Sequence, residues 1–269
     1  MTSLSIGPLI IPLGLLPWIA AFTGAWLTAM LRRRKQGRTD IEPLLWWALL
    51  AGLVVARAGF VVQYHGSFAD AWWTVLDIRD RGFWWPGGII GALLVLALAP
   101  GFRDPEQQRE RAVISAAGVG FAVPVLIAIT ALLPGSFPLP EIELQTTDGE
   151  LVNLREFSND NVSVINIWAS WCPHCHRSMP ILEQAQSDYP SVRFILVNQG
   201  ETASTVNQYF DEHGFEFDHL LLDPLARLAN AIGSRGVPTT LIIDAENNIV
   251  NVHTGGLSAA RLEALLGHL

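Results

Sequence analysis

Long apolar stretches fill the first half of the chain and constrain its fold more than any other feature. Residues 1–31 carry no charged side chain, and eight of the ten tryptophans fall before Pro100. A helix needs about 20 mostly apolar residues to cross the hydrocarbon core of a bilayer. Four stretches reach this length, at residues 8–31, 44–64, 83–102 and 112–133. We therefore predict an α-helical membrane domain with four transmembrane helices over residues 1–135.

The charges between these stretches predict how the helices are oriented. Residues 32–38 carry five Lys or Arg side chains and residues 103–111 carry three arginines, whereas residues 65–82 carry two arginines against three aspartates. Because basic loops stay in the cytoplasm, we expect residues 65–82 and both termini on the outer side. The basic cluster follows the first stretch instead of preceding it, so we interpret this stretch as a retained helix and not as a signal peptide.

Arg57 lies inside the second stretch, where an ionisable side chain usually faces a cavity or a partner, although it can also extend to the outer headgroups. Residues 55–64, and residues 84–91 with Gly87 and Gly88, resemble the early part of prolipoprotein diacylglyceryl transferase, which moves a lipid glyceryl group to a lipoprotein cysteine. Pro86 stands at the position where the family's motif has a histidine, and proline cannot act as an acid or a base. We expect an anchor that contacts lipid near Arg57, Gly87 and Gly88, with lipid transfer as an alternative.

The second half of the chain is acidic, with 6 Lys or Arg against 17 Asp or Glu in residues 137–269. This balance leaves no basic face for phosphates and excludes nucleic acid as a partner. Apolar runs alternate with helical patterns and predict an α/β domain over residues 136–269, preceded by a proline-rich spacer at residues 134–140. The expected strands are a hairpin around Asp148-Gly149 and residues 162–168, 192–197, 239–244 and 249–253; the expected helices are residues 173–189, 203–213, 225–231 and 258–266.

The chain has only two cysteines, Cys172 and Cys175, which stand between a predicted strand and a predicted helix. One helical turn separates them, so both sulfur atoms lie at the helix start and can form a disulfide. The helix dipole favours the Cys172 thiolate, so we predict Cys172 as the nucleophile and Cys175 as the residue that resolves the mixed disulfide. Pro173 and His174 should make the pair more oxidising than a Gly-Pro insert would.

Three segments of the second half resemble the TlpA/ResA branch of thioredoxin-like disulfide oxidoreductases: residues 166–175, Met179-Pro180 and residues 236–244. The resemblance implies a thioredoxin fold with no cofactor other than the redox-active disulfide. It also implies that Trp171 tunes the pair and that a cis-proline turn faces it and presents backbone groups to the partner polypeptide. The residues of that turn are Val237, Pro238 and Thr239.

Two positions depart from the pattern of related proteins. Thioredoxin proper has a buried aspartate where this chain has Asn166, and some reductases of the branch have a glutamate where it has Ser178. Water, His174 or His176 are therefore the remaining candidates for the proton acceptor of Cys175. The Pro-His insert also resembles that of the oxidase DsbA, which leaves the direction of electron flow open.

The predicted function is a protein-disulfide oxidoreductase anchored in the bacterial inner membrane, with the thioredoxin-like domain in the periplasm. We expect a reductase of envelope proteins, with an oxidase as the alternative. The predicted membrane helices contain no cysteine, so a separate membrane partner must recharge the pair. Residues 172–176 also match the Cys-x-x-Cys-His motif of haem c attachment, with His176 as its histidine. A further alternative is copper handling by Cys172, Cys175 and His176. Apart from these alternatives, we expect no metal site.

Overall fold

The computed structural model describes residues 3–6, 9–12, 16–36, 42–68, 75–76, 82–98, 105–132, 136–158, 162–234 and 236–267. The chain divides into two compact units. One comprises residues 2–66 and 82–134, and the other comprises residues 135–269 together with Met1 and residues 67–81. Each unit is described by itself.

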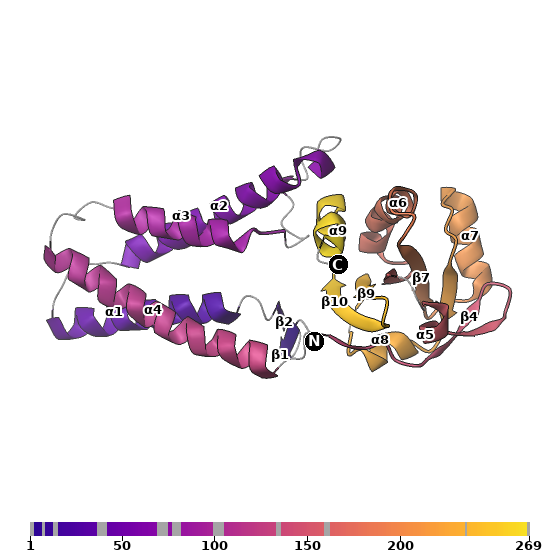
Figure 1. The fold of residues 1–269 in the computed structure, drawn as a ribbon, viewed down its shortest axis with the longest axis horizontal. Helices are drawn as coiled ribbons and strands as arrows, with labels where there is room; N and C mark the ends of the chain where they lie inside the picture. Colours follow the sequence, from indigo (N-terminus) through magenta and orange to yellow (C-terminus); the bar gives the residue numbers. More distant parts are fainter. Residues whose placement is uncertain are drawn as a thin grey trace. The chain divides into compact units, whose positions relative to one another are not determined.

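The first unit is helical and contains two pairs of packed helices. It comprises the strands β1 (Ser3–Ile6) and β2 (Leu9–Pro12), the helices α1 (Leu16–Gln36), α2 (Glu42–Gln63), α3 (Trp85–Leu98) and α4 (Pro105–Leu132), and the 3-10 turn η2 (His65–Phe68), which the second unit shares. Helix α1 packs along α4, and α2 packs along α3 (Figure 1). Glycines allow this close approach: a Cβ atom at Gly118 would lie 2.9 Å from the Ala21 carbonyl oxygen, and one at Gly91 would lie 2.8 Å from that of Ala51.

Three of the four predicted membrane stretches have different boundaries in the structure, and the helix expected from residue 112 begins at Pro105. The first stretch was expected to be helical from residue 8, but Leu9–Pro12 pairs with Ser3–Ile6 and the helix begins at Leu16. Proline removes a backbone donor and β-branched isoleucine favours strands, so Pro12 and its neighbours resist helix. Helix α3 has only 14 residues, Trp85–Leu98, about 21 Å at the helical rise.

Among the described residues, one helical stretch, Pro43–Gln63, is both long and apolar enough to cross a membrane. Helix α3 and Ala112–Ala128 within α4 are apolar but shorter. Helix α1 is 21 residues long, yet its last turn carries Arg32 to Lys35, which leaves 16 uncharged residues. The described part of the first half is therefore mainly helical, and by length and apolarity one of its helices meets the requirement for a membrane crossing.

The second unit is built on an eight-stranded sheet of order β3-β10-β9-β6-β7-β8-β4-β5. Its strands are β3 (Phe137–Pro138), β4 (Glu143–Thr146), β5 (Leu151–Asn153), β6 (Ser163–Trp168), β7 (Arg193–Gln199), β8 (Leu220–Asp223), β9 (Thr239–Ile243) and β10 (Asn248–Thr254). Strands β6, β7 and β8 are parallel, and the other neighbours are antiparallel. This arrangement confirms the predicted thioredoxin-like α/β domain.

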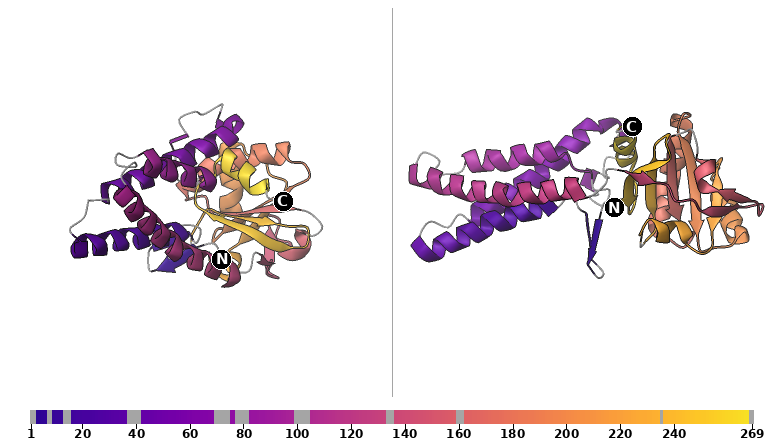
Figure 2. Two further views of the ribbon diagram at one scale, coloured as in Figure 1. Left: turned by 60° about the vertical axis from the view of Figure 1, so that its left-hand side comes forward. Right: turned by 60° about the horizontal axis from the view of Figure 1, so that its bottom comes forward.

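Helices cover both faces of this sheet (Figure 2). They are α5 (Leu154–Phe157), α6 (Pro173–Asp188), α7 (Ala203–His213), α8 (Arg227–Ala231) and α9 (Ala259–Leu266). On β6, Val164 and Trp168 point into the core that α6, α7 and α9 complete, whereas Ile165 and Ile167 point into the core beneath α5 and α8. Side chains alternate between faces because the strand repeat is two residues.

The structure corrects the proline-rich spacer and adds a strand that the sequence analysis missed. Phe137–Pro138 pairs with β10, and Leu139 is 1% exposed within the core beneath α5 and α8, so this segment belongs to the domain. The spacer prediction failed because a two-residue edge strand leaves no periodic signal. Strand β8 was missed for a similar reason, since four residues are too few to establish alternation.

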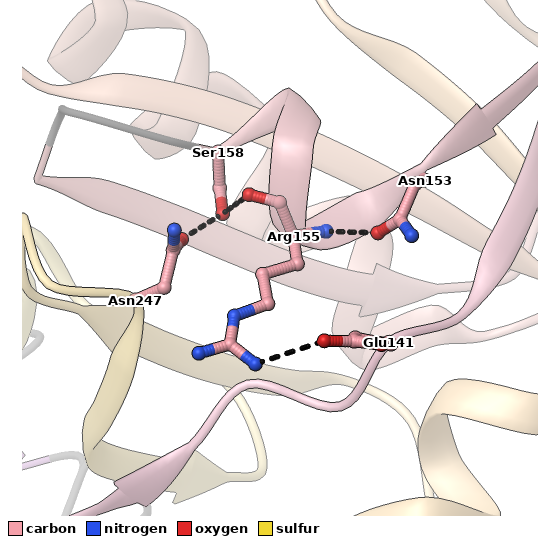
Figure 3. Close-up of polar contacts among 5 residues, drawn as sticks. All are labelled: Glu141, Asn153, Arg155, Ser158 and Asn247. Carbon is pink, nitrogen blue, oxygen red and sulfur yellow. Dashed lines mark hydrogen bonds and ion pairs between the residues drawn. The ribbon is translucent and has the colours of Figure 1, made fainter.

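Polar contacts fasten the start of the domain to the turn between β9 and β10 (Figure 3). The Asn153 side chain caps α5 by accepting a hydrogen bond from the Arg155 amide at 3.0 Å, and Arg155 pairs with Glu141 at 3.2 Å. Ser158, at the end of α5, donates to the Asn247 side chain at 2.6 Å. This turn follows the carboxyl end of β9, so these contacts lie at the sheet edge opposite the cysteine pair.

Candidate active site

The two cysteines form a disulfide where β6 ends and α6 begins. Cys172 has an extended backbone at the N-cap of α6, and its sulfur accepts a hydrogen bond from the Cys175 amide at 3.2 Å. Their Cα atoms are 5.2 Å apart, and the two residues are 3% and 0% exposed. Cys172 therefore stands where the unpaired amides and dipole of the helix stabilise a thiolate, and Cys175 is enclosed by the core.

The turn before β9 meets the cysteine pair, because β9 is antiparallel to β6 and begins where β6 ends. The peptide bond between Val237 and Pro238 is cis, and the Val237 carbonyl oxygen lies 3.6 Å from the Cys172 sulfur. Thr239 is buried, and its hydroxyl donates to the Gly236 carbonyl at 2.7 Å. The structure thus brings Val237 and Pro238 beside Cys172, whereas the Thr239 side chain is directed into the turn.

Residues next to the cysteines present both an apolar and a cationic surface. Trp171 is 66% exposed, and Pro173 occupies the first position of α6. The imidazole Nδ1 of the exposed His174 lies 2.7 Å from a guanidinium nitrogen of Arg177. Because arginine only donates, His174 Nδ1 is the acceptor of this hydrogen bond. Arg177, which the sequence analysis did not select, therefore supplies a permanent positive charge beside His174, which stands between the two cysteines in the sequence.

The two positions that depart from related proteins are buried and polar but not ionisable. Asn166 is 1% exposed and donates to the Thr240 hydroxyl at 2.9 Å, while its Oδ1 has no hydrogen-bond partner among the described residues. The Ser178 hydroxyl donates to the His174 carbonyl at 3.2 Å and accepts from the Leu257 amide at 3.1 Å. Ser178 therefore joins α6 to the loop before α9, a role that its position in the sequence did not indicate.

Glu201 is a site residue that the sequence analysis missed. It lies between β7 and α7, and its carboxylate accepts hydrogen bonds from the Ser170 amide at 2.7 Å, the Ser170 hydroxyl at 2.5 Å and the Asn198 amide group at 2.7 Å. Ser170 is two residues before Cys172, so this carboxylate holds the turn that leads into the redox pair. The contact spans 31 positions of sequence and has no local signal.

His176 contacts the same turn from the other side. Its Nε2 lies 2.5 Å from the Ser170 carbonyl oxygen, and its ring is 5.2 Å from that of Tyr209. Tyr209 also stacks on His213 at 4.3 Å, and burial raises the pKa of the Tyr209 hydroxyl. The Nε2 atom of His176 is thus occupied by a carbonyl oxygen of the turn. Within the described ranges, no three His, Cys, Asp or Glu side chains gather as a metal site.

The residues predicted to contact lipid lie where α2 and α3 pack together. Arg57 is 9% exposed, and its guanidinium donates to the Gly82 carbonyl at 2.8 Å and lies 5.6 Å from the Phe60 ring centre. Gly87 and Gly88 are buried, and a Cβ atom at Gly88 would lie 3.4 Å from the Ala56 Cβ atom. Helix packing accounts for these residues, and lipid contact stays a prediction.

Comparison with known proteins divides the chain in the same two halves. The Redoxin family matches residues 135–266, and the prolipoprotein diacylglyceryl transferase family matches residues 2–125. Thiol-disulfide oxidoreductase ResA of Halalkalibacterium halodurans is 34% identical over 125 residues, which cover 46% of this chain and 70% of that protein. A thiol:disulfide interchange protein DsbE homolog of Paracoccus denitrificans is 35% identical over 96 residues, 36% of this chain and 52% of that protein.

Two of the solved structures that resemble this chain each cover about half of it. A thiol:disulfide interchange protein of the thioredoxin family from Chlorobium tepidum is 24% identical with a TM-score of 0.43, and covers 49% of this chain and 95% of that chain. StoA of Bacillus subtilis is 20% identical with a TM-score of 0.41, and covers 48% of this chain and 99% of that chain.

Proposed function

The chain belongs to the family of ResA thiol-disulfide oxidoreductases, and from this premise we propose that it exchanges disulfides with envelope proteins through Cys172 and Cys175. One observation carries the proposal: the Cys172–Cys175 disulfide lies at the start of α6 with the Val237 carbonyl 3.6 Å from the Cys172 sulfur. A carbonyl in this position can accept a hydrogen bond from the backbone of a partner polypeptide while a sulfur atom of the partner contacts Cys172.

Reduction of a partner then proceeds in two exchange steps. The Cys172 thiolate attacks one sulfur of the partner disulfide, which forms a mixed disulfide and expels the other partner sulfur as a thiolate. The Cys175 thiolate next attacks the Cys172 sulfur, which closes the Cys172–Cys175 disulfide and releases the second partner thiol. Two electrons and two protons pass from the chain to the partner, so another dithiol must reduce the pair before the next turnover.

We propose the reducing direction because a carboxylate stands close to the nucleophile. Glu201 bonds to Ser170, two residues before Cys172, and its negative charge opposes a thiolate at Cys172. A less stable thiolate means a less stable reduced form, and therefore a stronger reductant. Thiol trapping in cells tests the direction: a mostly reduced pair supports a reductase, and a mostly oxidised pair would mean an oxidase.

We further propose that the helical half anchors the chain in the bacterial inner membrane, with both termini in the periplasm and four crossings. Among the described residues, 25 of the 28 exposed large apolar side chains fall between Trp18 and Ile127, as expected for faces that contact lipid. The basic residues 32–38 favour a cytoplasmic first loop. Because the only cysteines are Cys172 and Cys175, a separate membrane protein must supply their electrons.

The likeness of residues 2–125 to prolipoprotein diacylglyceryl transferase supports lipid as a partner of the anchor, including contact near Arg57, Gly87 and Gly88. Transfer chemistry is not part of the proposal, because Pro86 occupies the place of the family's motif histidine and offers no acid, base or donor.

Trapping of mixed disulfides tests the proposed exchange. A Cys175→Ser variant of the full chain should accumulate mixed disulfides between Cys172 and envelope proteins, because the resolving thiol is absent. The matched Cys172→Ser variant should accumulate almost none, since Cys175 is 0% exposed. In purified form, the wild-type chain should reduce a disulfide-bonded reporter peptide and both variants should fail to turn over. Equal trapping by the two variants, or none by either, contradicts the assigned roles.

A further inference from the structure

We propose that Glu201 is a positioning residue that fixes the Ser170 turn before Cys172 and, through its charge, makes the redox pair more reducing. The inference rests on the proposed exchange function and adds a group that sets its direction. All three polar groups of Ser170 are engaged: the amide and the hydroxyl donate to Glu201 at 2.7 and 2.5 Å, and the carbonyl faces His176 at 2.5 Å. The turn that delivers Cys172 is therefore held by one carboxylate and one imidazole.

The charge of Glu201 is not cancelled by a cation in the described part of the chain. Its hydrogen bonds come from Ser170 and from the Asn198 amide group, which are neutral donors. Ser170 stands two positions before Cys172, so their Cα atoms are at most about 7 Å apart and the carboxylate lies on the order of 10 Å from the nucleophilic sulfur. Since Glu201 is half-buried, solvent screens this repulsion only in part.

The hydrogen bonds of Glu201 and its negative charge can be tested separately, because a glutamine at this position can make the same contacts. In a Glu201→Gln variant, the amide oxygen can accept from the Ser170 amide and from Asn198, as one carboxylate oxygen does now. The new NH2 group can donate to the Ser170 hydroxyl, which is able to accept. Glutamine therefore removes the negative charge and keeps the turn, whereas Glu201→Ala removes both.

Two measurements on the purified full chain test the proposal. The midpoint of the thiolate absorbance titration of Cys172 should fall by roughly half a pH unit in Glu201→Gln, the effect expected for one charge about 10 Å away at a partly screened site. The equilibrium with glutathione should shift roughly threefold towards the reduced protein, because the thiolate is part of the reduced form. In Glu201→Ala, amide hydrogen exchange at residues 170–172 should also accelerate, since the turn has lost its acceptor.

Glu246→Gln is the matched control, because Glu246 is an exposed glutamate in the turn between β9 and β10 at the opposite sheet edge. It removes the same charge and should move neither the titration nor the glutathione equilibrium. A Glu201→Gln protein that behaves like Glu246→Gln overturns the inference, even if Glu201→Ala is destabilised. If the wild-type chain shows no dithiol exchange at all, the proposed function fails instead, so the two failures are distinguishable.

Discussion

Replacing Ser178 by alanine should release the loop that flanks the redox pair. Ser178 is 1% exposed, and its hydroxyl is the described acceptor for the Leu257 amide at 3.1 Å. Alanine leaves that buried amide without a partner, and an unsatisfied buried donor costs about 1–3 kcal/mol. The same loop passes His174, since a Cβ atom at Gly256 would lie 3.6 Å from its Nδ1. The change therefore weakens the packing of the loop against the first turn of α6.

Hydrogen exchange measures this effect where it occurs. If the loop opens locally, a loss of 1–3 kcal/mol accelerates exchange of the Leu257 amide by roughly 5- to 150-fold. The matched control is Ser187→Ala, which removes an exposed hydroxyl from the same helix and should leave exchange at Leu257 unchanged. Equal exchange rates at Leu257 in the wild type and in Ser178→Ala would refute the reasoning, because they would mean that the hydroxyl does not hold the loop.

Three further predictions address charge, helix packing and pH. Arg177→Gln removes the cation beside His174 and should raise the midpoint of the thiolate titration by a few tenths of a pH unit, opposite in sign to Glu201→Gln; a fall in the midpoint would contradict this role. Gly118→Leu should force α1 and α4 apart at a cost of about 1–3 kcal/mol, measured as earlier thermal unfolding in detergent, whereas Gly120→Leu, with open space around it, should not. Burial, and secondarily the charge of Arg193, lower the pKa of His219 in the folded chain. As the pH falls below about 6.5, the unfolded chain therefore protonates at this histidine before the folded chain does, and the free energy of unfolding should decline. Urea unfolding of a His219→Gln variant should show a weaker decline, and an identical pH profile would exclude this histidine as the cause.

The fold was predictable from the sequence to the extent that its signals are local. Strand 162–168 followed by a helix from residue 173 could be recognised because apolar residues recur with the period of each element. The same proximity along the chain identified Cys172 and Cys175 as a pair. Local patterns were less informative at the ends of apolar stretches, where composition alone did not distinguish the strand Leu9–Pro12 from the helix that begins at Leu16.

Sequence patterns alone were enough to propose Cys172 and Cys175 as the reacting residues, because two cysteines one helical turn apart at a helix start are typical of a dithiol centre. Tertiary structure decided what surrounds them. Val237, Glu201 and Leu257 reach the start of α6 from positions 65, 31 and 79 residues away from their partners. Such contacts depend on the order and direction of the strands, which bring distant loops to one edge of the sheet, and no spacing along the chain encodes them. The charges near a thiolate set its stability, so the direction of electron flow depends on the packed domain and not on the cysteine motif alone.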